Sequence, residues 1–179
     1  ARPTGAPGTA VGRDIDVSLF DVALHNLNYP GTWYLNAGAV QGREARSAHP
    51  SLTPSQLYRT RDGWIMLMCN KERFWQVLAR ELGHAEWIAD PRFADYAARL
   101  AHRGELERAL DAVLGEQPTA HWLQRLAGNV PGAPVNDIAQ ALESQFVRAH
   151  GNIGQYPYPD GRSARMVANP VRVDGAELP

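Results

Sequence analysis

The chain of 179 residues contains only one cysteine, Cys69. A single thiol can form no disulfide within the chain and supplies no thiolate cluster for zinc or iron–sulfur ligation. The scarcity of cysteine favours a reducing, cytoplasmic location. Cys69 ends a hydrophobic run, which is typical of a buried structural thiol rather than a reactive one.

Long hydrophobic runs and an excess of either charge are also lacking. The longest apolar stretches, such as residues 64–69, are far shorter than the roughly 18 to 20 residues that span a bilayer. The 18 basic and 19 acidic residues nearly cancel and are interspersed along the chain. We therefore expect no membrane segment and no nucleic-acid partner. Residues 1–12 lack the charged and apolar regions of a signal peptide.

The composition that is present, 44% hydrophobic and 21% charged, is that of an ordinary globular chain. Its length predicts one domain, or one domain with extended connecting arms. Strand-like runs occur toward both ends of the chain, whereas helical spacing dominates the middle. The sequence therefore predicts an α+β fold.

The N-terminal third predicts one helix and then an irregular segment. Alternation over residues 14–17 predicts a short strand, and Ser18, followed three residues later by Asp21, is typical of a capping box. A helix is expected over about 19–27. Residues 28–53 carry prolines and glycines without sustained periodicity, so we expect a long irregular segment, which is usually functional.

Strand signals are clearest at residues 56–60 and 64–68, which flank an Asp-Gly turn. This dipeptide between β-rich runs is the strongest short hairpin signal, so we predict a hairpin. Residues 130–135, with two prolines, predict an edge strand or a connector. A last strand is expected within residues 166–173.

Helices are predicted between these strands. Asn70 is expected to cap a helix that ends at Gly83. One longer helix is predicted over 93–114, with Arg99 and Arg103 on its polar face. Shorter helices are predicted at 86–89, after a cap at Thr119, at 136–142 and at 144–150.

The residues alone point to little chemistry. The six histidines show no close metal-ligand spacing and share no motif with Cys69, so no metal site is expected. Asp14 and Asp16 would share one strand face, where paired carboxylates suit a cation, but a solvated face is the simpler interpretation. No nucleophile elbow of the form GxSxG occurs.

Arginine, by contrast, is abundant, while Lys71 is the one lysine. Guanidinium groups suit carboxylate or phosphate ligands through bidentate contacts, although scattered surface arginines are equally consistent. The sequence thus predicts an α+β domain with a candidate anion-binding loop. The residues that suggest this loop are Arg43, Arg46, His49, Ser51, Arg59 and Arg61.

Four blocks of sequence occur in a recognisable order: Gly12–Asp21, His49–Gly63, Glu86–Phe93 and Val130–Val135. They resemble the class III CoA-transferase (CaiB/BaiF) superfamily, which includes formyl-CoA transferase and α-methylacyl-CoA racemase. The resemblance covers roughly residues 12–173. It implies the second half of a longer protein, without the large CoA-binding domain.

The resemblance also implies the organisation of this half. Residues 1–55 would form a connecting helix and irregular linker, 56–150 a small α+β domain of hairpin strands and helices, and 151–179 a returning linker arm. In that family two ring-like subunits interlock, so we expect a homodimer.

The activity implied is transfer of coenzyme A between an acyl-CoA thioester and a small carboxylic acid. The family's nucleophilic aspartate forms anhydride and thioester intermediates, and it lies upstream of Gly12. We therefore expect no catalytic residue in this segment, and Asp14, Asp16 and Asp21 do not match the nucleophile. Coenzyme A would be bound as a substrate, not as a tightly held cofactor, and no residue here is assigned to it. The segment alone should be inactive.

Residues 38–55 take the place of the glycine-rich loop that covers the active site in formyl-CoA transferase. A loop that closes on a reactive anhydride would exclude water. His49, Ser51 and Gln56 are therefore the candidate substrate contacts. Packing of the same loop in a dimer interface is the alternative for each.

Two other functions stay open. An acyl-CoA racemase of the same fold is one, but the racemases carry a Glu-Pro pair after the second hairpin strand where this chain has Lys71-Glu72, which favours a transferase. A non-catalytic binding or assembly module is the other. Such a module would fold well without an upstream partner.

Overall fold

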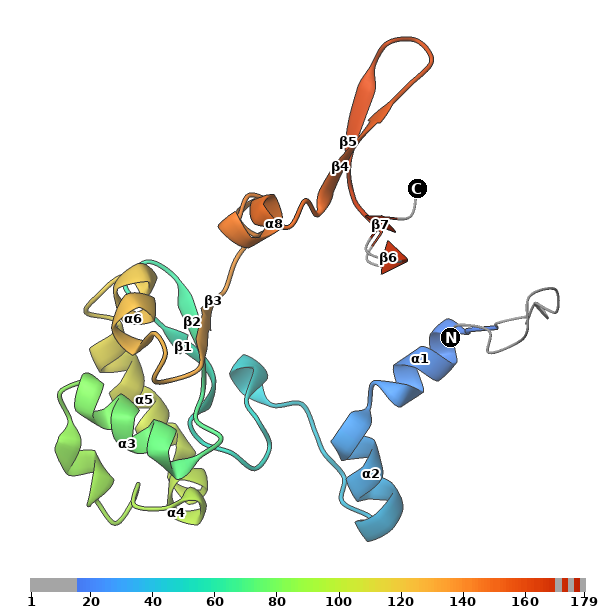
Figure 1. Cartoon of the computed structure of the whole chain (residues 1–179). Coiled ribbons are helices and arrows are strands. Elements are labelled where there is room, and N and C mark those ends of the chain that lie inside the picture. Colours follow the sequence, from blue (N-terminus) through green and yellow to red (C-terminus); the bar gives the residue numbers. More distant parts are fainter. Residues whose placement is uncertain (1–15, 170–171, 174–175, 178–179) are drawn as a thin grey trace, which may run out of the picture. The chain divides into compact units, whose positions relative to one another are not determined.

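The computed structural model describes residues 16–169, 172–173 and 176–177 (Figure 1). The chain divides into two compact units, Ala1–Ala45 and Arg46–Pro179. Among the described residues, no helix is long and apolar enough to cross a membrane.

The first unit contains helix α1 (Leu19–His25), which begins where the sequence predicts. Ser18 accepts a hydrogen bond on its hydroxyl from the backbone N–H of Asp21 at 3.0 Å, which satisfies one of the free amides of the first turn. Of the strand predicted over 14–17, the first two residues lie outside the described residues. The last two form no strand, so the strand prediction is wrong for them.

A second helix, α2 (Asn28–Ala37), occupies the first part of the segment predicted to be irregular. That prediction is wrong because Pro30 lies in the first helical turn, where the missing N–H would have no helical partner anyway. Gly38, with φ of 64°, ends the helix in the left-handed conformation that glycine adopts freely. Neither α1 nor α2 has a buried residue.

The second unit is built on an antiparallel sheet of three strands in the order β1 (Ser55–Arg59), β2 (Trp64–Met68) and β3 (Gly132–Pro134). The predicted hairpin is confirmed. The N–H of Thr60 donates to the carbonyl of Gly63 at 3.0 Å across the turn.

Strand β3 confirms the predicted edge strand, and it lies unusually close to β2. A Cβ atom added to Gly132 would lie 3.2 Å from Cδ2 of Leu67 and 3.3 Å from the carbonyl oxygen of Met66. Only glycine fits this close approach without displacing a neighbour.

Four α-helices pack beside the sheet (Figure 1). They and a short 3₁₀ turn are α3 (Glu72–Glu81), η2 (Ala85–Ile88), α4 (Tyr96–Ala101), α5 (Arg103–Leu114) and α6 (Thr119–Leu126). Together they bury one hydrophobic core, whose apolar area drives folding. Its fully or almost fully buried side chains include Tyr58, Ile65, Leu67, Trp75, Leu78, Leu106, Leu110, Leu114, Trp122 and Leu126.

Two predicted helix caps are wrong. Lys71, not Asn70, takes the cap position of α3, and no side chain caps that helix. Thr119 is the first residue of α6 and not its cap, because its hydroxyl donates to Asp62 at 3.0 Å. The predicted stop at Gly83 is confirmed, with φ of 81°.

The single helix predicted over 93–114 is also wrong, because the chain breaks at His102 between α4 and α5. Asp95 caps α4 by accepting from the N–H of Ala98 at 2.8 Å, so the preceding residues stay outside the helix. The apolar stripe continues across the break and therefore gave no sign of it. Arg99, predicted on a polar face, is completely buried.

The remaining elements follow β3 in the sequence. Asp137 caps α7 (Ile138–Leu142) through a capping box with Gln140, so the helix begins two residues later than predicted. The last strand was predicted over 166–173, but β5 covers residues 163–167, paired with β4 around a turn that contains Asp160-Gly161. The other elements here are α8 (Gln145–Ala149), β4 (Ile153–Pro157), β5 (Ser163–Val167), β6 (Arg172–Val173) and β7 (Ala176–Glu177).

Candidate functional site

The candidate site, defined here as the 46–54 loop, runs from the last two residues of η1 (Ala45–Ser47) to the start of β1. It begins with two residues in the left-handed region, Arg46 with φ of 55° and Ser47 with φ of 52°. That conformation costs a residue other than glycine about 1 kcal/mol or more and persists only where surrounding contacts impose it. The contacts of the loop therefore define its geometry.

The side chain of Arg46 is held by two carboxylates of α5 and by the Trp64 ring of β2. Its guanidinium donates to the carboxylate of Asp111 at 2.6 Å, lies 3.3 Å from that of Glu107, and lies 5.3 Å from the centre of the Trp64 ring. Burial opposes its charge, but the two carboxylates outweigh burial and raise the pKa of Arg46. Arg46 was a candidate anion ligand, but its charge is already paired.

His49 and Ser51 are brought together within the loop. Nδ1 of His49 accepts hydrogen bonds from the backbone N–H groups of Ser51 and Leu52, both at 3.2 Å, and lies 3.4 Å from the hydroxyl of Ser51. Because Nδ1 is an acceptor, the proton of the neutral ring lies on Nε2. The loop thus presents a half-buried imidazole beside an exposed hydroxyl.

The neutral state of His49 has two causes. Partial burial comes first, and the positive charge of Arg103 adds to it, so the pKa of His49 lies below its usual value. At neutral pH the ring is therefore uncharged. It can accept or donate a hydrogen bond without bringing a charge to a ligand.

Gln56 lies apart from that pair, at the start of β1. Its side chain is buried, and its amide nitrogen donates to Glu107 at 2.6 Å. Glu107 in turn contacts Arg46, so Gln56 stabilises the loop indirectly, by positioning the carboxylate that pairs with Arg46.

Arg99 anchors the other end of the loop, and the sequence analysis missed this role. Its fully buried guanidinium donates to the carbonyl of Thr53 at 2.8 Å, to the carbonyl of Phe93 at 2.9 Å and to the carboxylate of Glu72 at 2.6 Å. These charge-assisted bonds tie the loop to α3 and to the segment before α4.

Arg103 completes the attachment by donating to the carbonyl of His49 at 2.6 Å. A sequence signal for both arginines existed, because positions 99, 103, 106 and 110 follow helical spacing. Leu106 and Leu110 on this stripe are core residues. Arg99 and Arg103 therefore lie on the same face as core residues. A search for apolar residues alone does not identify them, because both are charged.

The other arginines that the sequence suggested as anion ligands do not form one anion-binding site with the 46–54 loop. Arg59 lies over the Trp64 ring at 5.3 Å, the backbone of Arg61 donates to Gln117, and Arg43 lies in the first unit, exposed. Cys69 is buried, as predicted, and burial raises its pKa to about 12. No cluster of metal-binding side chains occurs in the described ranges.

Comparisons with known proteins agree on one family. The model of CoA-transferase family III matches residues 4–179. Over 172 residues the chain is 28% identical to an acetyl-CoA:oxalate CoA-transferase of Acetobacter aceti, covering 96% of this chain and 43% of that protein. Over 152 residues it is 26% identical to a mouse (Mus musculus) succinyl-CoA:glutarate CoA-transferase, covering 84% and 35% respectively.

A solved structure shares the fold. The crystal structure of a CaiB/BaiF family protein from Brucella suis matches with a TM-score of 0.73 and 28% identity, over 94% of this chain and 43% of that one. The chain thus spans less than half the length of these relatives. The chain belongs to CoA-transferase family III, and its fold is part of the CaiB/BaiF fold.

Proposed function

We propose that the chain is the small-domain portion of a CoA-transferase that moves coenzyme A from an acyl-CoA thioester to a carboxylic acid. The observation that carries this proposal is the family match over residues 4–179. It is supported by relatives named as transferases that use oxalate or glutarate. In this proposal residues 1–55 are the connecting helix and linker, 56–150 the small domain and 151–179 the returning arm.

The proposed reaction uses an aspartate upstream of Gly12. Its carboxylate attacks the donor thioester, forming a mixed anhydride and releasing CoA thiolate, which then attacks the aspartyl carbonyl and releases the donor acid. The acceptor carboxylate attacks the resulting aspartyl-CoA thioester and again displaces the thiolate. Attack of the thiolate on the acyl side of the second anhydride gives the new acyl-CoA and restores the aspartate.

The 46–54 loop serves this reaction by facing the substrates. His49 and Ser51 provide an uncharged ring and a hydroxyl, which hydrogen-bond to an acid or a thioester without neutralising a carboxylate nucleophile. Gln56, buried behind them, acts by holding Glu107. A fixed loop over the anhydride excludes water, which would otherwise hydrolyse it.

The enzyme we propose is a cytoplasmic homodimer whose arms interlock. Apolar side chains exposed within the chain support a role for the arms in contacts with other protein surfaces. Leu19 and Phe20 of α1 are exposed, as are Met166 and Val167 of β5.

The test is an exchange assay on the longer protein that contains this chain. Acetyl-CoA or succinyl-CoA is mixed with ¹³C-labelled oxalate, glutarate or malate, and new thioesters are measured by mass spectrometry. We expect transfer to at least one acid and none by the 179-residue chain alone. Inversion of an α-methyl centre without CoA exchange, or exchange by the chain alone, contradicts the proposal.

Variants of the loop sharpen this test. Ser51→Ala and His49→Gln should raise the KM for the acid or increase hydrolysis of the donor. Arg80→Gln is the matched control, because Arg80 is exposed on α3 and belongs neither to the loop nor to its anchors. Equal kinetics in all three variants would remove the loop from the proposal.

A further inference from the structure

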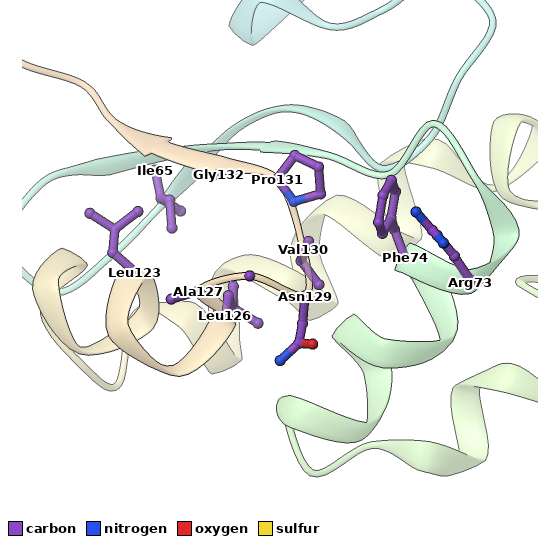
Figure 2. A pocket seen from close by; sticks show the side chains of 11 residues that line it. Ile65, Arg73, Phe74, Leu123, Leu126, Ala127, Asn129, Val130, Pro131 and Gly132 are labelled. Carbon is purple, nitrogen blue, oxygen red and sulfur yellow. The ribbon is translucent and has the colours of Figure 1, made fainter.

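A pocket of about 550 Å³ opens beside the packed core, between the start of α3, the end of α6 and the segment that leads into β3 (Figure 2). Pockets that bind small molecules measure roughly 300 to 1,000 Å³ and are mostly apolar, with a few polar groups that fix orientation. This pocket has both the size and the mixed lining of such sites.

The lining changes character along the pocket. Figure 2 shows Ile65 and Leu123 at one end, and Phe74 with Arg73 beyond it at the other. The described lining residues include no carboxylate. The pocket is therefore aliphatic at one end and cationic at the other.

Arg73 carries a charge that this part of the chain does not neutralise. Its guanidinium lies 4.9 Å from the centre of the Phe74 ring, which orients it, and it forms no ion pair with the described residues. The side-chain amide of Asn129, on the pocket wall, likewise has no protein partner among them. Polar groups at the rim thus remain available to a ligand.

The walls are fixed before any ligand binds. The N–H of Val130 donates to the carbonyl of Leu126 at 3.0 Å, and the carbonyl of Pro131 accepts from Met68 at 3.0 Å. The absence of a side chain at Gly132 keeps this segment against β2. A ligand would therefore not have to order its own site.

We propose that this pocket binds an amphiphilic carboxylate, with its head group on Arg73 and its hydrocarbon chain along the aliphatic end. The charge of Arg73 favours an anion over a neutral ligand, because only an anionic head group can form a charge-assisted hydrogen bond with the guanidinium. The inference rests on the pocket alone and does not depend on the transfer reaction.

The test is calorimetric titration of the purified protein with octanoate, with octanol as the uncharged probe of the same length. We expect octanoate to bind about tenfold more tightly than octanol, because only the carboxylate forms a charge-assisted hydrogen bond with Arg73. Arg73→Gln should remove that preference. Ala127→Phe, at an exposed lining position, should block both probes.

Arg80→Gln is the matched control, because it removes a second exposed arginine of α3, about two turns further along. It should leave octanoate binding unchanged. Equal affinity of octanoate for the wild-type and Arg73→Gln proteins overturns the proposal, as does equal binding of octanol. If octanoate does not bind and Ala127→Phe alters sedimentation, the surface is an interface between copies, and the proposal is wrong.

Discussion

Two parts of this chain are made of similar elements but are stabilised in different ways. Helices α3, α5 and α6 bury side chains in one core, in which Leu110 is 0% exposed, and α4 buries Arg99. Helices α1, α2, α7 and α8 bury none, and Leu19 is 90% exposed; they are called the arm helices here, although α7 and α8 fall within residues 56–150. Local hydrogen bonds at the helix ends can therefore fix where a helix begins and ends. Burial of its side chains decides whether tertiary packing stabilises that helix.

The difference in burial also separates two structural roles. The packed part imposes an uncommon backbone on the 46–54 loop through Arg99, Arg103 and the carboxylates of α5. The arm helices carry apolar side chains that are exposed in the part of the chain that the structure describes. Four changes test this contrast, beginning with the largest expected effect.

Loss of the buried guanidinium should be the most damaging. Arg99→Met leaves the carbonyls of Thr53 and Phe93 and the carboxylate of Glu72 without their donor. Breaking such a buried network costs about 3 to 5 kcal/mol. Urea unfolding measures this, and Arg80→Met, on the exposed face of α3, should change stability by less than about 0.5 kcal/mol. Similar midpoints for the two variants would mean that Arg99 is not an anchor.

Matched leucines compare the two parts directly. Leu110→Ala should destabilise the chain by about 2 to 5 kcal/mol, because it leaves a cavity in the core. Leu19→Ala removes the same atoms from an exposed arm helix and should stay within about 0.5 kcal/mol in the monomeric chain. Equal losses in urea unfolding would erase the distinction between the parts.

The close approach of β3 predicts a smaller effect. Gly132→Val places atoms against Leu67 and the backbone of Met66 and should cost about 1 to 3 kcal/mol. Gly42→Ala is the control, since nothing lies within 4 Å of its added Cβ. Thermal unfolding that shifts equally in both variants contradicts the tight packing.

The smallest effect is a dependence on pH. Asp62 accepts from the backbone and hydroxyl of Thr119, and the backbone bond is the main reason that its pKa lies below the usual 3.8. A carboxyl with a lowered folded-state pKa contributes stability above pH 3.8 that is lost as the pH falls through the folded-state value. The melting temperatures of wild type and Asp62→Asn should therefore differ at pH 7, and the difference should be smaller at pH 3.

Asp160→Asn, on an exposed turn of the C-terminal segment, is the control for that experiment, because it should leave the transition of the packed part unchanged at both pH values. A constant difference between wild type and Asp62→Asn over the whole range would show that the carboxylate does not act through its charge.

The parts of the fold that sequence reasoning predicted are those with short-range causes. The hairpin follows from an Asp-Gly turn between β-rich runs, and α1 follows from a Ser18 cap. The break at His102 could not be predicted, because the apolar stripe continues on both sides of it.

The candidate site divides in the same way. His49 and Ser51 meet because they are two residues apart, so their pairing is local. Gln56 was predicted to face a substrate on sequence position alone, and its bond to Glu107, 51 residues away, is invisible to any local pattern. The roles of Arg99 and Arg103 depend on contacts 46 and 54 residues away, which only the fold brings together.

Hydrogen exchange with mass spectrometry, on the 179-residue chain diluted until sedimentation shows a monomer, tests the contrast between the two parts most directly. We predict slow exchange in β1, β2, α3 and α5, where buried packing protects the backbone, and exchange close to free-peptide rates in the arm helices. Protection of α1, α2, α7 and α8 equal to that of the core in the monomer would contradict the account.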